Sequence, residues 1–287
     1  MSVVRRIGRW LIPRLPVGND LLYTASRRYV DRTDGQNDSN MERNGELTFL
    51  RGVLGNCRIV FDVGANVGEW AQHALAINSN ISLHCFEPGH QNFLQLVANV
   101  PSQVVCNELG LSSHPDDKPL FMIDGNPGMT SLYQRRGLTD LGLQPPVEGE
   151  RVTLVRFDDY CLEHQIDHVD FVKLDVEGHE LEVLQGMTRS LDENRVGIIQ
   201  FEYGGCNIDA GVLLKDLWSF FDTFSYGLYK LLPRGPRRVH EYSQSHENFQ
   251  YQNWAAICLE YGRSPAPSSA PTKRHGPKFG RQEEEWW

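Results

Sequence analysis

The sequence lacks any apolar run long enough to cross a membrane. None of its 287 residues lies in an uninterrupted apolar stretch of about 18 residues or more, whereas a spanning helix needs about 20. The first residues combine arginines with a short apolar segment, but no small-residue cleavage site follows them. We therefore expect neither a membrane-spanning helix nor a secretory signal.

Cysteine is scarce and never occurs in pairs. The six cysteines stand singly, so the sequence lacks the spacing of a zinc site or of a disulfide framework. Several of them lie in apolar, strand-like runs, which predicts buried free thiols in a reducing compartment. We therefore expect a cytoplasmic protein.

The chain also lacks an excess of basic residues. Lysine and arginine number 28 against 37 acidic residues, and the net charge is −9. Nucleic-acid-binding domains usually carry clustered positive charge, so we expect no nucleic-acid partner. Hydrophobic residues make up 40% of the chain, as in a globular protein.

What the sequence does contain is a glycine-rich turn between a predicted strand and a predicted helix. Residues 61–68 read FDVGANVG, after a β-rich run and before a helical pattern. The next predicted strand ends in Glu87, 19 residues after Gly68. An acidic residue about 20 residues after such a turn commonly binds ribose hydroxyls. The pair predicts a ligand that contains a nucleoside.

The turn does not match the dinucleotide fingerprint, which needs glycine at its first, third and sixth positions. Those positions hold Gly64, Asn66 and Glu69. The carboxylates of Glu69 and Asp62 would also repel a pyrophosphate. A ligand with a cationic centre and no phosphate fits better, and S-adenosylmethionine is such a ligand.

The predicted cofactor site assigns a role to each residue of the turn. Asp62 faces the cationic end of S-adenosylmethionine, and Glu87 accepts hydrogen bonds from its ribose hydroxyls. Gly64 and Gly68 permit close approach of the backbone. The alternative is a tight turn that uses glycine for conformational reasons alone.

The pattern of residues along the chain divides it into three parts. Residues 1–45 form an N-terminal extension whose first part is basic and amphipathic; packing on the domain is expected, and contact with an anionic membrane is the alternative. Residues 46–262 form the domain. Residues 263–287 have no periodicity, which predicts a disordered tail.

Within the domain, predicted strands and helices alternate, which indicates an α/β fold with a mostly parallel sheet and helices on both faces. Residues 110–113 and 120–123 predict a small hairpin or edge insertion, and residues 152–157 a short strand. The segments 124–150 and 233–252 are expected to be loops that shape the acceptor pocket. The predicted strands of the main sheet cover 58–63, 81–87, 102–107, 169–175, 196–203, 226–232 and 253–260.

Four residues at the ends of central strands are candidate catalytic residues. Asp175 ends the strand at 169–175, Glu177 and His179 follow in its turn, and Glu202 ends the next strand. Ligands of open α/β sheets bind beyond these carboxyl ends, so the four could orient an acceptor and remove its proton. Structural roles are the alternatives: Glu177 could brace the turn or pair with a basic neighbour such as Lys173, and His179 could be a solvated residue at the start of a helix. The site is predicted to hold no metal, although a magnesium ion on the three carboxylates is chemically sensible.

Several of these segments together resemble the FkbM family of S-adenosylmethionine-dependent methyltransferases. The resemblance covers about residues 46–260. It implies a Rossmann-like class I fold with seven strands in the order 3-2-1-4-5-7-6 and strand seven antiparallel. It also implies Asp62, Gly64, Asn66, Gly68 and Glu87 as cofactor contacts. The matching segments are 61–68, 86–88, 128–132, 171–180 and 183–186.

The resemblance implies methyl transfer to a hydroxyl of a small molecule or of a carbohydrate- or lipid-like acceptor. A nucleic-acid methyltransferase is an alternative, but residues 175–178 read DVEG where base-amino methylases carry an Asn/Asp-Pro-Pro-aromatic run. A catalytically silent cofactor-binding protein and a dehydrogenase are further alternatives. The acceptor and the oligomeric state stay open.

Overall fold

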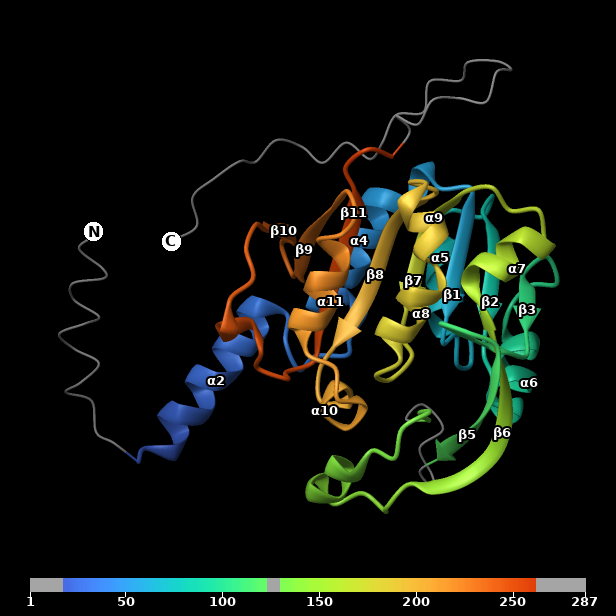
Figure 1. The fold of residues 1–287 in the computed structure, drawn as a ribbon. Helices are drawn as coiled ribbons and strands as arrows, with labels where there is room; N and C mark the ends of the chain where they lie inside the picture. The colour runs from blue at the N-terminus through green and yellow to red at the C-terminus, as the bar shows by residue number, and fades with distance from the viewer. Residues whose placement is uncertain (1–17, 123–129, 262–287) are drawn as a thin grey trace.

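The computed structural model describes residues 18–122 and 130–261, and eight of the strands in this part form one sheet (Figure 1). Its order is β10-β9-β11-β8-β7-β1-β2-β3. Five neighbouring strands run parallel to one another, namely β3, β2, β1, β7 and β8. The strand β11 is antiparallel to both β8 and β9. Seven of them reproduce the predicted class I order, with the last strand antiparallel. The strands are β1 (Ile59–Val63), β2 (Ser82–Phe86), β3 (Val105–Asn107), β7 (Val169–Leu174), β8 (Val196–Tyr203), β9 (Tyr226–Leu232), β10 (Gly235–Val239) and β11 (Gln252–Cys258).

The eighth strand, β10, corrects the prediction that residues 233–252 form a loop. It pairs with β9 along the edge of the sheet, where Pro236 lies opposite Leu231. Proline lacks the N–H that an inner strand needs, but an edge strand tolerates it. The Pro- and Arg-rich composition of this segment is typical of a loop. It is nevertheless compatible with a strand here, because the strand lies at the edge of the sheet.

Both faces of the sheet are covered, because side chains of successive strand residues point to opposite sides. Phe61 and Val63 belong to one core and Val60 to the other. The first core includes side chains from α7 (Phe157–Glu163), α8 (Glu180–Gly186), α9 (Thr188–Asp192) and α11 (Leu214–Phe221). The second includes side chains from α4 (Glu46–Val53), α5 (Glu69–Ile77) and α6 (His90–Asn99).

A second, three-stranded sheet lies below the carboxyl ends of the main strands in Figure 1. It contains β4 (Gly110–Ser112), β5 (Asp116–Met122) and β6 (Val147–Arg156) in the order β4-β6-β5. The sequence predicted only a small insertion here. The strand β6 begins inside the segment predicted as a loop, and its pairing with the distant β4 and β5 explains why local patterns predicted only its last part, at 152–157.

Two helices, α2 (Asp20–Asp34) and α3 (Met41–Asn44), form the described part of the predicted N-terminal extension. The predicted tail at 263–287 lies outside the described residues, and the domain limits stay predictions. None of the described helices is both long and apolar enough to cross a membrane. All six cysteines are free, as predicted. The remaining short helices are η2 (Leu54–Asn56), η4 (Arg136–Leu141), α10 (Cys206–Ala210) and η5 (Gln244–His246).

Candidate active site

The turn between β1 and α5 packs directly against the turn after β7. Gly64 has a φ of 82°, and a Cβ atom there would lie 1.9 Å from the carbonyl oxygen of Asp175. Asn66 and Gly68 are also left-handed, with φ of 48° and 89°. Glycine at 64 is therefore required both by the backbone conformation and by the contact between the two turns.

The carboxylate of Glu87 is buried and holds the glycine-rich turn in place. The backbone N–H of Asn66 donates to its Oε2 and that of Gly89 to its Oε1, each at 2.9 Å. Burial raises the pKa of Glu87 to about 7, although both hydrogen bonds act in the opposite direction. A carboxylate has about four acceptor sites, so this one can accept further hydrogen bonds from a ligand.

Asp62 presents a buried carboxylate in the middle of the sheet. Its side chain is 0% exposed, and neither oxygen has a hydrogen-bond partner in the structure. Burial raises the pKa of Asp62 to about 6. The amide oxygen of Asn66 is likewise buried without a partner. Buried polar groups are normally satisfied, so these atoms fit a site completed by a ligand with a positive centre and hydrogen-bond donors.

A buried lysine balances the acidic groups. Lys173 stands beside Asp62 in the register of β7 and β1, and its Nζ donates to Asp175 Oδ2 at 2.9 Å. Burial lowers the pKa of Lys173, but the surrounding carboxylates, Asp175 foremost, raise it above its ordinary value. Glu177 does pair with a basic residue, as the structural alternative expected, but its partner is Arg135 at 2.5 Å and not Lys173.

Glu177 and its partner connect the turn after β7 to the segment that enters η4. Glu177 has a φ of 52°, which a residue with a side chain rarely adopts. Burial raises the pKa of Glu177, and the guanidinium of Arg135 opposes that rise. The backbone carbonyl of Glu177 also accepts a hydrogen bond from Ser131 Oγ at 2.9 Å. The strained turn is therefore held from outside by two side chains of one connecting segment.

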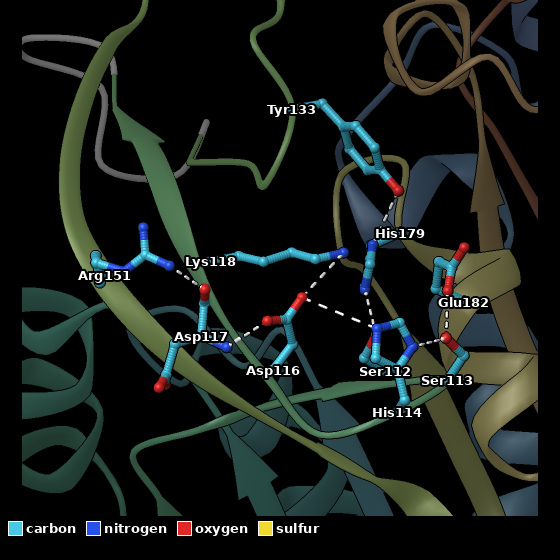
Figure 2. A network of polar contacts seen from close by, with 10 residues as sticks. All are labelled: Ser112, Ser113, His114, Asp116, Asp117, Lys118, Tyr133, Arg151, His179 and Glu182. Atoms are coloured by element: carbon cyan, nitrogen blue, oxygen red, sulfur yellow. Dashed lines mark hydrogen bonds and ion pairs between the residues drawn. The ribbon is translucent and has the colours of Figure 1, made fainter.

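His179 lies between two hydroxyl groups, as Figure 2 shows. Its Nδ1 is 2.9 Å from Tyr133 Oη, and its Nε2 is 3.0 Å from Ser112 Oγ. The side chain is 1% exposed, and burial lowers the pKa of His179 to about 4. The imidazole is therefore neutral near pH 7, and the predicted alternative of a solvated His179 is wrong.

Glu202 lies at the end of β8, where its Oε1 accepts a hydrogen bond from Tyr251 Oη at 2.8 Å. Burial and the nearby Asp175 raise the pKa of Glu202 well above its usual value. The three carboxylates considered for magnesium thus take different partners. In residues 18–122 and 130–261, no group of three or more His, Cys, Asp or Glu side chains is placed to hold a metal ion.

One cavity brings most of the predicted site residues together. Three predicted cofactor residues and three predicted catalytic residues line it: Gly64, Asn66, Glu87, Asp175, Glu177 and His179. The described part of the lining does not include Asp62, Gly68 or Glu202. Its other wall comes from the small sheet and the segment between its strands β5 and β6, including Leu120, Leu132 and Leu154. The cavity thus has a polar wall from the main sheet and a largely apolar wall from the insertion.

Several residues of this site were missed or misread in the sequence. Lys173 carried a usable signal, because a lysine inside an apolar central strand must find a carboxylate partner. Ser112, Tyr133 and Arg135 carried none. They lie on the small sheet or on the segment between its strands β5 and β6, and only the tertiary fold brings them to His179 and Glu177.

Comparison with known proteins gives a consistent result. A model of the methyltransferase FkbM domain matches residues 62–228, which is more than half of the chain. The chain is 25% identical to the hexuronic acid methyltransferase AglP of Haloferax volcanii over 229 residues, covering 75% of this chain and 90% of that protein. It is 28% identical to the 31-O-demethyl-FK506 methyltransferase FkbM of Streptomyces tacrolimicus over 153 residues, covering 45% and 59%.

Among solved structures, the plantazolicin methyltransferase BpumL in complex with SAH aligns with a TM-score of 0.42 and 6% identity. The alignment covers 84% of this chain and 91% of that chain. The strand order of the main sheet, and not this low similarity, establishes the fold class.

Proposed function

The chain belongs to the FkbM methyltransferase family, and from this premise we propose that it transfers a methyl group from S-adenosylmethionine to a hydroxyl oxygen of a carbohydrate or another small hydroxylated acceptor. The family and the enzyme class predicted from the sequence are confirmed.

The observation that carries the proposal is the shared cavity. Gly64 and Glu87, at the ends of β1 and β2, line it together with Asp175 at the end of β7. In α/β sheets, ligands bind beyond these carboxyl ends. A cofactor bound at the ends of β1 and β2 would therefore meet, within one cavity, an acceptor bound at the end of β7.

The cofactor side of the site requires little from the protein beyond binding. Bound S-adenosylmethionine supplies a methyl group that its sulfonium has already activated. Glu87 accepts hydrogen bonds from the ribose hydroxyls, and the buried charge of Asp62 attracts the positive end of the cofactor. Gly64 keeps the floor of the turn free of a side chain. The unsatisfied oxygens of Asp62 and Asn66 support these assignments.

On the acceptor side, Asp175 is the proposed proton acceptor. It lines the cavity, and Lys173 fixes its carboxylate through Oδ2. A hydroxyl loses its proton as its oxygen attacks, so a positioned base speeds the reaction. His179 is neutral, and both of its ring nitrogens have hydroxyl partners, so we assign it a positioning role. Glu177, through its pair with Arg135, shapes the rim.

The names of the two relatives support the acceptor class. One acts on a hexuronic acid, and the other on 31-O-demethyl-FK506. The first supports a carbohydrate acceptor, and the second supports transfer to oxygen. The apolar wall of the cavity, which includes Leu120, Leu132 and Leu154, would exclude water and hold the acceptor close to the methyl group.

The function is tested by incubating the purified chain with methyl-labelled S-adenosylmethionine and a panel of glycans, glycolipids and small hydroxylated compounds. We expect S-adenosylhomocysteine release together with one labelled O-methyl product, located by mass spectrometry. Asp175→Asn should lower turnover by about 100-fold or more while cofactor affinity changes little. The exposed Asp159→Asn is the control.

Three results would contradict the proposal. Labelling of RNA or DNA in a parallel incubation, with no labelled product from the panel, would favour the nucleic-acid alternative. Cofactor binding without S-adenosylhomocysteine release from any acceptor would favour the silent protein. Unchanged turnover in Asp175→Asn would remove that residue from the mechanism.

A further inference from the structure

The helix α2 carries large apolar side chains that nothing in the described structure covers. None of its residues Asp20–Asp34 is buried. Leu21 is 84% exposed and Tyr29 is 73% exposed. Figure 1 shows α2 standing out from the sheet at the lower left. A helix that buries nothing has no tertiary packing to stabilise it, although packing usually stabilises protein helices.

These side chains follow a helical pattern. Leu21, Leu22, Ala25 and Tyr29 share one side of α2, because helix neighbours recur every three to four residues. We call this set the apolar stripe. The far side carries the polar or charged Asp20, Thr24, Arg27 and Asp31, and the exposed Tyr23 and Val30 lie between that side and the stripe. Arg28 borders the stripe, and Arg32 lies in line with it near the end of the helix. The helix is therefore amphipathic, with its apolar side facing solvent.

The contacts that do hold α2 lie away from the stripe. Asp34 forms an ion pair with Lys230 at 3.7 Å, and Arg27 donates to Gln250 at 3.4 Å. Just beyond the helix, the N–H of Asn37 donates to the carbonyl of Tyr251 at 3.0 Å. Tyr251 is the residue that contacts Glu202 at the end of β8. The helix is thus anchored near the carboxyl ends of the parallel strands, where the cavity also lies.

Charge is divided unevenly along the chain. Residues 1–34 contain seven arginines and three aspartates, whereas the rest of the chain contains 21 basic and 34 acidic residues. The N-terminal part is therefore net positive on a strongly acidic protein. A surface that attracts this part must be negatively charged and must also accept apolar side chains.

We propose that α2 docks on an anionic lipid surface. The apolar stripe enters the headgroup boundary, and the neighbouring arginines pair with lipid phosphates. Amphipathic helices with arginines beside an apolar face bind membranes in this way, and each basic residue near an anionic surface contributes favourably. A second copy of the chain is a poorer occupant, because the exposed apolar side chains of one 15-residue helix offer far less area than a stable protein interface buries.

The test is flotation of the full chain with phosphatidylcholine vesicles that either contain or lack phosphatidylglycerol. We expect binding to the anionic vesicles only, and loss of binding at high salt. Leu21→Asp and Tyr29→Asp should each lower the bound fraction by about tenfold, because each removes an apolar contact and buries a charge. Thr24→Asp adds the same charge on the opposite side, so most binding should remain. Unchanged binding of S-adenosylhomocysteine would show that the variants are folded.

Other results would overturn the proposal. Absence of flotation with either vesicle would do so, as would an equal loss in Thr24→Asp, which would show that overall charge alone matters. A dimer in sedimentation velocity that Leu21→Asp dissociates would also overturn the proposal, provided that vesicles bind none of the proteins. In that case the apolar stripe would belong to an interface between two copies.

Discussion

At the residue scale, Asp62 places a carboxylate in the central strand, 0% exposed and without a hydrogen-bond partner in the structure. Because burial raises the pKa of Asp62 from 3.8 to about 6, the folded protein binds this proton more tightly than the unfolded chain does. The group therefore costs no stability below about pH 4. The cost grows as the pH rises towards 6 and stays constant above it.

This cost leads to a prediction for Asp62→Asn. The free energy of unfolding of this variant should be about 1–3 kcal/mol higher than that of wild type near pH 7.5. The increase should be smaller near pH 5. Its affinity for S-adenosylmethionine should fall, because the carboxylate that attracts the sulfonium is gone. Urea unfolding at both pH values and titration calorimetry measure the two effects. A variant less stable than wild type near pH 7.5 would show that the carboxylate stabilises the fold.

For Glu87 the prediction concerns both affinity and its pH dependence. The pKa of this residue is raised to about 7, so affinity for S-adenosylhomocysteine should increase between about pH 6 and pH 8 as the carboxylate becomes ionised. Glu87→Gln should lower affinity by about tenfold or more and remove this pH dependence. The exposed Glu163→Gln is the control. Calorimetry that finds equal affinity in wild type and Glu87→Gln would exclude the ribose contact.

His179 is expected to act through position rather than through proton transfer. Because burial lowers its pKa to about 4, the imidazole does not titrate between about pH 5 and pH 8. His179→Gln and Tyr133→Phe should both raise the KM for the acceptor several-fold, since both loosen the segment that closes the cavity. The pH profile of kcat should keep its shape in both variants. A profile that loses an ionisation near neutral pH only in His179→Gln would identify the histidine as the base.

At the element scale, α11 depends on a distant carboxylate for its first turn. Glu247 accepts hydrogen bonds from the backbone N–H groups of Leu214 and Lys215, and from the hydroxyls of Tyr203 and Tyr242. Its pKa is lowered because these hydrogen bonds together outweigh the effect of burial, which raises it. The stabilisation is therefore present above the ordinary carboxyl pKa and is lost as the pH falls through the lowered value.

Glu247→Gln should consequently lower the free energy of unfolding by about 1 kcal/mol at neutral pH. The difference from wild type should shrink below about pH 4. Chemical unfolding measures both effects, and the exposed Glu241→Gln on the same segment is the control. An equal change in the two variants would mean that α11 does not depend on this cap.

The elements themselves show which features were predictable. Strands β1, β2, β7 and β8 are short apolar runs bounded by turns, so the period and the length of the runs identified them. The strand β10 was missed because its proline and arginines are typical of a loop, and β6 was recognised only in its last part. Both errors concern strands whose partners, not their own residues, determine their structure.

At the scale of the whole molecule, the order of the main sheet was predictable through the family resemblance. The grouping of Gly64, Glu87 and Asp175 followed because carboxyl ends of parallel strands share one edge. The other wall of the cavity was not predictable. Tyr133 and Arg135 reach the site from a segment whose sequence has no period, and only the small sheet places it there.

The central claim is that an S-adenosyl nucleoside binds at the turn after β1, with its ribose on Glu87. A crystal structure of the chain with S-adenosylhomocysteine tests it most directly. The account predicts both ribose hydroxyls within hydrogen-bond distance of Glu87 and the sulfur atom facing Asp175 across the cavity. A ligand bound elsewhere, or a cavity filled by side chains in the complex, would contradict it.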